Sequence, residues 1–278
     1  MSRKPSGAFG ELWEIVKTLF WAAVIAIVIR TFAYEPFNIP SSSMVPTLLI
    51  GDYLFVSKSA YGYGKYSFPG GIVPVEGRIW EGEPKRGEVV VFRPPGEPET
   101  DFIKRVIGLP GDRVQVVQGV LHINGVAVTR QRIEDYVDPD RPGARPVPQY
   151  LETLPGGSIH TIIEAAGDLG PMDDTPVYVV PARHYFMMGD NRDGSNDSRA
   201  LSSINFVADP GAFDAKCTTG TIDQSSVACF DKVGFVPKEN LIGPAKILFW
   251  SYDSSNRWYN PITWITALRF GRLFNVIE

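Results

Sequence analysis

The sequence has few of the residues that metal centres and nucleic-acid surfaces require. Its 278 residues include three histidines and two cysteines, which form no HExxH or CxxC pair. Ligands this few and this far apart argue against a zinc site. Basic residues do not outnumber acidic ones, and a net charge of −4 gives no general attraction for DNA or RNA. We therefore expect no metal, no cofactor and no nucleic-acid partner.

Other common motifs are missing as well. There is no G-x-S-x-G elbow and no P-loop, and the dispersed histidines leave a Ser-His-Asp triad possible but unsupported. The acidic segment 189–197 looks like a calcium loop, but its register fails. With Gly194 at the sixth position, the first and twelfth ligands would be Gly189 and Ala200, and neither carries a carboxylate.

The two cysteines, Cys217 and Cys229, lie in the segment 200–232, which is rich in Thr, Gly, Ser and Asp and is expected to be a surface insertion. An exported location would permit a disulfide between them. Two free thiols are the alternative.

The chain has one long apolar run, near the N-terminus. Residues 18–29 carry no charge, but crossing a bilayer takes roughly 20 apolar residues. We therefore expect a span over residues 12–34, with Lys17 and Arg30 snorkelling outward. A cleaved secretory signal and a buried core helix are the alternatives.

The charges that flank this run predict its orientation. Arg3, Lys4 and Lys17 lie on the N-terminal side, and Arg30 lies on the other. The positive-inside rule then predicts a single-pass anchor with a cytoplasmic N-terminus and an exported remainder.

Strand patterns dominate the rest of the chain. Short runs rich in Val, Ile, Phe and Tyr are separated by Gly, Pro and Asp turns, without the long helices that a parallel sheet requires. The runs cover residues 53–58, 88–93, 102–107, 113–117, 120–123, 177–180 and 247–252. We therefore expect a mainly β fold, in which an N-terminal transmembrane helix precedes an antiparallel β-sheet core with a smaller appended β region.

The expected division of the chain follows from these patterns. Strands between 129 and 175 are not assigned, because this part is rich in Pro and Asp and weakly periodic. The stretch 262–274 is a candidate amphipathic helix on the membrane surface, with packing on the β core as the alternative. The parts are an N-terminus and anchor (1–34), a β core (35–112 and 185–260, with the insertion 200–232), a smaller β region (113–184) and a C-terminal amphipathic segment (261–278).

A serine cluster follows the apolar run after about a dozen residues. Ser41, Ser42 and Ser43 are set between prolines, and a serine without histidine is a nucleophile if a neutral lysine removes its proton. Burial on an apolar strand face lowers the pKa of a lysine toward neutrality. Strand alternation puts Lys104 on one face of residues 102–107 and Arg105 on the other. Arginine does not deprotonate, so Lys104 is the candidate base.

Two other lysines, Lys58 and Lys65, are expected to be solvated. They lie near the turn-like segment 61–64.

Five ordered blocks of sequence resemble the bacterial type I signal peptidases. They are Ser41-x-Ser43-Met44-x-Pro46-Thr47, Gly51-Asp52, 86–92, 103–112 and Gly189-Asp190-Asn191-Arg192-Asp193-x-Ser195-x-Asp197-Ser198-Arg199. The resemblance is faint over 129–175 and absent over 200–232.

The resemblance implies a Ser-Lys dyad. Ser43 corresponds to the nucleophile and Lys104 to the general base. The oxyanion site corresponds to the Ser41 hydroxyl and the backbone N–H of Ser43. Met44 corresponds to a residue that shapes the pocket for small side chains.

Three further residues have implied supporting roles. Ser195 corresponds to the residue that orients the lysine, and Asp197 and Arg199 correspond to an ion pair that supports the same loop.

The resemblance implies a serine endopeptidase that removes signal peptides from exported preproteins, anchored in the bacterial cytoplasmic membrane with its catalytic domain on the outer face. Its expected partners are preprotein signal peptides and membrane lipid. Two alternatives are a Ser-Lys protease of the self-cleaving repressor type and a non-enzymatic, membrane-tethered β-domain that binds exported proteins.

Overall fold

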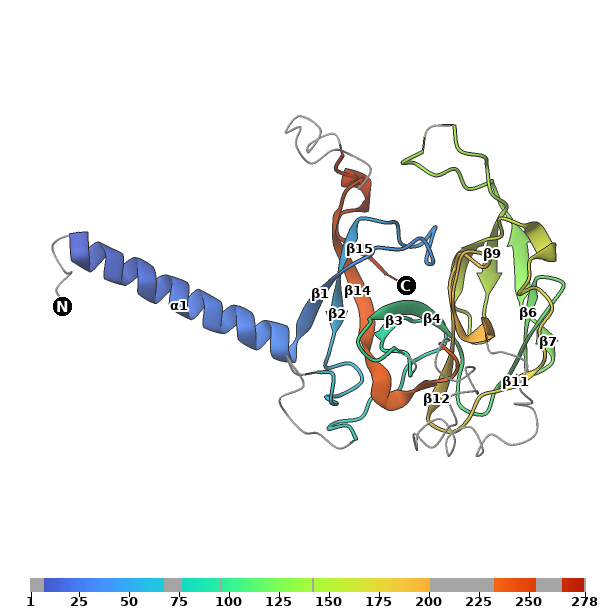
Figure 1. Ribbon diagram of the computed structural model, residues 1–278, viewed down its shortest axis with the longest axis horizontal. Helices are drawn as coiled ribbons and strands as arrows, with labels where there is room; N and C mark the ends of the chain where they lie inside the picture. The colour runs from blue at the N-terminus through green and yellow to red at the C-terminus, as the bar shows by residue number, and fades with distance from the viewer. Residues whose placement is uncertain are drawn as a thin grey trace.

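A computed structural model describes residues 8–67, 77–95, 97–141, 143–200, 233–253 and 267–277. Its one α-helix, α1 (Ala8–Phe32), projects from the β-strands as an isolated rod (Figure 1). Residues 10–32 are long and apolar enough to cross a membrane, and the apolar window of this helix is 0% buried by the rest of the chain. Its side chains expose large apolar groups throughout. The helix therefore lacks the protein contacts of a soluble core helix.

The largest sheet among the described residues has eight strands. Every strand pair in it is antiparallel. In spatial order the strands are β1 (Tyr34–Asn38), β2 (Asp52–Ser57), β14 (Leu241–Ser251), β3 (Val89–Phe92), β4 (Phe102–Gly108), β12 (His184–Met188) and β13 (Val236–Pro237), with β15 (Asn275–Val276) on β14.

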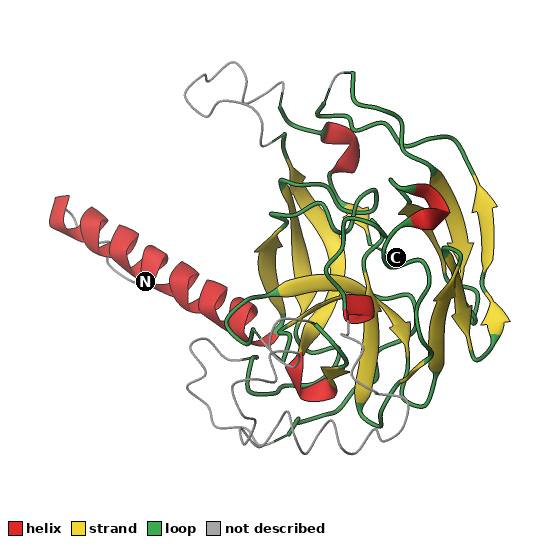
Figure 2. Cartoon of the chain, turned by 45° about the vertical axis from the view of Figure 1, so that its right-hand side comes forward, coloured by secondary structure: helices red, strands yellow, loops and turns green. Residues whose placement is uncertain are grey.

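Two smaller antiparallel sheets form a second β region at one side of the large sheet (Figures 1 and 2). One consists of β8 (Thr129–Arg132), β9 (Gln149–Thr153) and β10 (Ile159–Ile163). The other consists of β5 (Arg113–Val117), β6 (Val120–Ile123), β7 (Val126–Ala127) and β11 (Tyr178–Val179). The expected fold class, mainly β with an N-terminal apolar helix, is confirmed.

The large sheet is buried on both faces in its centre. All of β3, all of β12 and β4 from Ile103 onward are buried. One apolar cluster joins β2, β3 and β14 to Met44 and Leu48, and another joins β4, β5 and β12. A charged side chain on β4 is therefore removed from water whichever face it occupies.

The structure departs from the sequence expectations at several elements. Strand β14 begins at Leu241, well before the expected 247, and β12 was not expected at all. The described part of the expected C-terminal helix, 267–274, contains a 3-10 turn at Phe270–Arg272 and leads into β15. It packs on β14, which is the alternative given above, and residues 262–266 lie outside the described residues.

The interpretation of Lys58 as solvated is wrong. Its side chain is 2% exposed, and its Nζ lies 2.9 Å from Glu35 Oε2. Glu35 belongs to β1, of which only the first residue, Tyr34, falls within the expected membrane span. Cys217, Cys229 and nearly all of the insertion 200–232 lie outside the described residues.

Candidate active site

The serine cluster lies in a tight loop between β1 and β2. Backbone hydrogen bonds between Ile39, Gly51 and Asp52 close this loop at its base. Met44 is completely buried beneath it, in the cluster that contains β2, β3 and β14. The loop is thus fixed by a buried apolar anchor directly after Ser43, and Ser43 itself is 7% exposed.

The segment after β12 supports the serine loop from another direction. The backbone N–H of Asn191 donates to the carbonyl oxygen of Ser43 at 3.1 Å. Its side-chain amide donates to the carbonyl oxygen of Ser42, also at 3.1 Å. The Ser41–Ser43 stretch therefore has its backbone held while the Ser43 hydroxyl remains available.

Strand β4 brings Lys104 into contact with Ser43. The Nζ atom of Lys104 lies 2.6 Å from Ser43 Oγ, and it also donates to the carbonyl oxygen of Ile103 at 2.9 Å. The side chain is 4% exposed. Burial lowers the pKa of Lys104 from 10.5 to about 8, against the opposing influence of Asp197 and Asp190. An amine with this pKa is neutral in a useful fraction of molecules near neutral pH, and its distance from the hydroxyl suits proton transfer.

Ser41 lies beside the same hydroxyl. Its Oγ is 3.4 Å from Ser43 Oγ, and the residue is exposed. A hydroxyl in this position can turn toward a charge that develops on a bound carbonyl oxygen.

Asp197 and Arg199 form a buried ion pair. The Arg199 guanidinium donates to both carboxylate oxygens of Asp197 at 3.0 and 2.9 Å, and the Gly189 N–H donates to the same carboxylate at 3.0 Å. Burial alone would raise the pKa of Asp197, but Arg199 holds it below its ordinary value. The pair therefore holds together the two ends of the segment 189–199, which follows β12.

Ser195 is buried near this pair, but it does not bond to the lysine. Its Oγ has no partner of hydrogen-bonding geometry among the described residues. The hydroxyl lies close enough to Asp197 to contribute to the lowered pKa of that carboxyl. Its orienting role therefore stays a prediction.

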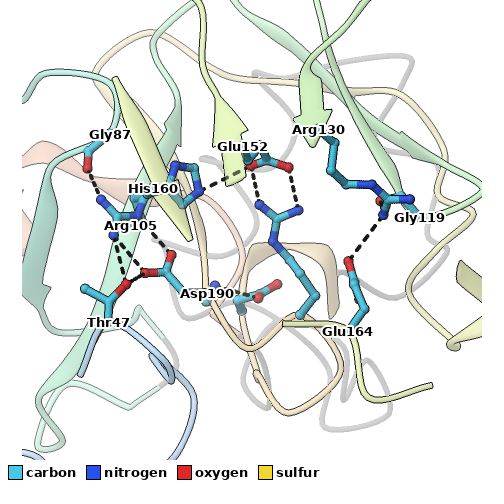
Figure 3. A network of polar contacts seen from close by, with 12 residues as sticks. Thr47, Gly87, Arg105, Gly119, Arg130, Glu152, His160, Glu164 and Asp190 are labelled. Atoms are coloured by element: carbon cyan, nitrogen blue, oxygen red, sulfur yellow. Dashed lines mark hydrogen bonds and ion pairs between the residues drawn. The ribbon is translucent and has the colours of Figure 1, made fainter. Parts of the chain in front are cut away.

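The structure adds a buried polar network that the sequence did not reveal (Figure 3). Arg105 donates to both carboxylate oxygens of Asp190 at 2.9 and 2.7 Å and to the carbonyl oxygen of Gly87 at 2.6 Å. Thr47 donates to Asp190 at 2.6 Å. The network thus ties β4 to the serine loop and to the segment after β12.

A second part of the network joins this segment to the smaller β region. Arg192 donates to both carboxylate oxygens of Glu152 on β9, and His160 Nε2 lies 3.3 Å from the same carboxylate. Although Glu152 is fully buried, Arg192 and His160 lower its pKa to about 2. The pairing of Arg192 with Glu152 was not predictable from the sequence, because the two residues lie far apart along the chain.

A pocket of about 470 Å³ opens beside the Ser43 hydroxyl. Its apolar walls come from the end of β1 and the start of β4. The lining residues include Phe37, Ile39, Ser41, Ser43, Ile103 and Lys104. Met44 lies beneath the pocket, fully buried, and is not part of its lining.

One group of carboxylates has the composition of a metal site. Single oxygens of Glu164, Asp173 and Asp193 lie within 4.8 Å of one another. Burial raises the pKa of Glu164 to about 8, helped by the two aspartates and opposed by Arg192. Burial likewise raises the pKa of Asp173. None of these carboxylates forms a hydrogen bond with Ser43 or Lys104, so the group lies outside the candidate active site.

Comparison with known proteins identifies the family. Residues 12–250 match the family model for signal peptidase, peptidase S26. Signal peptidase I of Rickettsia canadensis (strain McKiel) is 34% identical over 275 residues, which cover 93% of this chain and 91% of the relative. Signal peptidase I of Rickettsia prowazekii (strain Madrid E) is 36% identical over 267 residues, with 90% and 88% covered.

A solved structure is also similar. The crystal structure of a signal peptidase I from Enterococcus faecalis V583 is 22% identical, with a TM-score of 0.28, and the match covers 58% of this chain and 96% of that one. The family match and the curated relatives confirm the resemblance seen in the sequence blocks. The chain belongs to the signal peptidase family, peptidase S26, and is a serine endopeptidase.

Proposed function

We propose that this chain is a membrane-anchored endopeptidase that removes signal peptides from exported preproteins, with Ser43 as nucleophile and Lys104 as general base. The observation that carries the proposal is the 2.6 Å contact between the buried Lys104 amine and the Ser43 hydroxyl. No described histidine shares this site, so the amine is the base available to Ser43.

The chemistry follows from the two groups. Neutral Lys104 takes the Ser43 hydroxyl proton as Oγ attacks the scissile carbonyl carbon. The Ser41 hydroxyl and the Ser43 N–H stabilise the resulting oxyanion. The C–N bond then breaks, Lys104 returns the proton to the leaving amine, and an ester joins the signal peptide to Ser43. Water, activated by the same amine, hydrolyses that ester.

The pocket beside Ser43 supports a preference for small side chains before the cut. On the β12 side, β4 is paired only from Arg105 to Gly108. The stretch Phe102–Lys104 therefore has an open strand edge toward the pocket, and an extended peptide can add to such an edge. Shallow apolar walls from Phe37 and Ile39 leave room for small residues.

The anchor supports a substrate that is itself embedded in the bilayer. A signal peptide and α1 in the same membrane meet at a high effective concentration. We propose the cytoplasmic membrane as the location, with the N-terminus in the cytoplasm and the β-sheets on the outer face. A protease added to sealed, right-side-out vesicles should digest the β-sheets; full protection would contradict this orientation.

The decisive experiment is mass spectrometry of a preprotein after incubation with the purified protein in detergent. Wild type and Ser42→Ala should yield a product cut after a small residue. Ser43→Ala and Lys104→Ala should yield none, because each removes one half of the dyad. Processing by either of these two variants at the parental rate would refute the assignment. No product with wild type would instead favour a binding module.

A further inference from the structure

A second hollow lies next to the serine loop and has no part in the chemistry proposed above. It has a volume of about 720 Å³ and lies between the loop after β1 and the segment 136–147 of the smaller β region. We call it the second groove; the residues that define it here are Ser42, Val45, Tyr136, Arg145, Val147 and Asn191.

The second groove and the pocket beside Ser43 are separated by two thin segments. In the serine cluster, Ser41 and Ser43 line the pocket, whereas Ser42 lines the second groove. After β12, Gly194 lines the pocket and Asn191 lines the second groove. A peptide that crosses Ser43 Oγ therefore passes from one hollow toward the other.

The floor of the second groove is apolar. Val45, Leu49 and Ile163 are buried together there, with Tyr136 and Val147 packed against them. Backbone polar groups next to this floor are already engaged, since Asn191 bonds to the carbonyl oxygens of Ser42 and Ser43. The surface accordingly suits small or apolar side chains of an extended chain.

Most charges at its rim are already partnered. Asp138 pairs with Arg141 at 3.6 Å, and Asp140 accepts from the Arg269 guanidinium. Asp253, at the far end, also has an interaction partner. Arg145 is exposed and forms no hydrogen bond or ion pair with any residue that the structure describes.

We propose that the second groove binds the mature side of the preprotein, the residues that follow the scissile bond, and that Arg145 favours an acidic side chain there. The inference rests on the proposed function, because it assigns the pocket to residues before the cut. It adds a specificity determinant on the other side of the cleaved bond, with Arg145 acting on substrate charge and taking no part in the bond-breaking step.

The first test uses substrate peptides that are identical before the cut and carry Asp, Ala or Lys a few residues after it. Wild-type protein in detergent should cleave the Asp peptide with a kcat/KM roughly 5-fold above that for the Lys peptide, the size expected of one charge pair near a surface. Arg145→Glu should reverse this order. Arg113→Glu, the same reversal at an exposed residue of β5 outside the second groove, should preserve it.

The second test uses peptide length. Peptides that end directly after the cut should be cleaved more slowly than those that continue for several residues. Ala144→Trp, which fills the second groove at a half-buried loop position, should slow cleavage of the long peptides and leave the short ones unchanged.

The outcomes are distinguishable. The second-groove proposal is overturned if wild type cuts all peptides equally and neither Arg145→Glu nor Ala144→Trp changes their relative rates. The proposed function stands in that case. If wild type cuts none of them and no preprotein, the proposed function itself fails.

Discussion

The proposed chemistry depends on single side chains, and Lys104 has the strictest requirement of them because it must be uncharged to act. Its amine must be neutral to accept a proton, and burial lowers its pKa to about 8. The charged form dominates below that pH, so kcat/KM should fall about tenfold for each pH unit below about pH 7 and level off above about pH 8.

The measurement is a pH–rate profile with a peptide substrate that carries no titratable group near the cut. Lys104→Arg keeps a charge at every accessible pH and should be inactive throughout. A profile for wild type that stays flat from about pH 5 to 9 would argue against Lys104 as the base.

The burial of Lys104 also lowers the free energy of unfolding at neutral pH. The pKa of Lys104 falls from 10.5 to about 8 on folding, so below about pH 8 the charged amine costs the folded state up to about 3 kcal/mol. As the pH rises toward about 10.5, the folded state releases the proton first and the cost disappears. Lys104→Met should therefore raise the free energy of unfolding at neutral pH, and this gain should shrink at alkaline pH.

Denaturant unfolding of the detergent-solubilised protein at about pH 7 and about pH 10 measures this difference. Lys85→Met, at an exposed lysine, is the control and should change stability little at either pH. A Lys104→Met variant less stable than wild type at neutral pH would show that the two hydrogen bonds of the amine outweigh its desolvation.

The roles of single residues were only partly predictable from sequence. Strand alternation and the sequence blocks placed Ser43 and Lys104 together, because both belong to segments with a recognisable local pattern. Alternation also puts Arg105 on the opposite face of β4, but it does not reveal that both faces are buried. Arg105 pairs with Asp190 after β12, and Lys58 pairs with Glu35 on β1, so only the folded chain shows these pairings.

Buried ion pairs join secondary-structure elements at the site, in addition to the hydrogen bonds of the sheet. Asp190, after β12, receives two hydrogen bonds from Arg105 on β4 and one from Thr47 in the serine loop. Both members of the ion pair are almost completely buried. Asp190→Ala should destabilise the protein by about 3–5 kcal/mol, because it leaves the Arg105 guanidinium buried without a counter-charge.

Denaturant unfolding checks this value, and Asp135→Ala is a matched control. Asp135 pairs with Arg132 at the surface, where both side chains are well exposed, so its loss should cost no more than about 0.5 kcal/mol. Equal effects from the two substitutions would mean that the Arg105–Asp190 pair does not support the site.

Elements with local patterns were predicted, and those defined by long-range contacts were not. The runs 113–117 and 120–123 were predicted from their composition, and β5 and β6 have these same bounds. Strand β12 (His184–Met188) is buried at every position and so lacks alternation. The first half of β14 contains Gly243 and Pro244, which normally argue against a strand. Here they fall where β14 passes between β2 and β3 with shifts in register.

In the molecule as a whole, only a few residues separate the apolar helix proposed as the anchor from the serine loop. Strand β1 begins at Tyr34, directly after α1 ends at Phe32. The Tyr63 hydroxyl donates to the Phe32 carbonyl oxygen at 2.6 Å, and the Lys58 N–H donates to that of Ala33 at 3.0 Å. The serine loop follows β1 directly. The anchor is therefore fixed to the sheet that carries the nucleophile.

A fixed anchor predicts that the membrane raises the rate of processing by bringing enzyme and preprotein together. We expect processing to be roughly 100-fold faster when the protein and a preprotein share the same vesicles than when they occupy separate vesicles at equal total concentrations. Tethering two partners to one membrane raises their effective concentration, and such tethering strengthens an interaction by factors of this size. A short soluble peptide, which is not confined to the bilayer, should be cleaved at the same rate in both preparations and serves as the control. Quantifying the mature product over time separates the cases. Equal rates for the preprotein in both arrangements would mean that α1 does not contribute to substrate encounter.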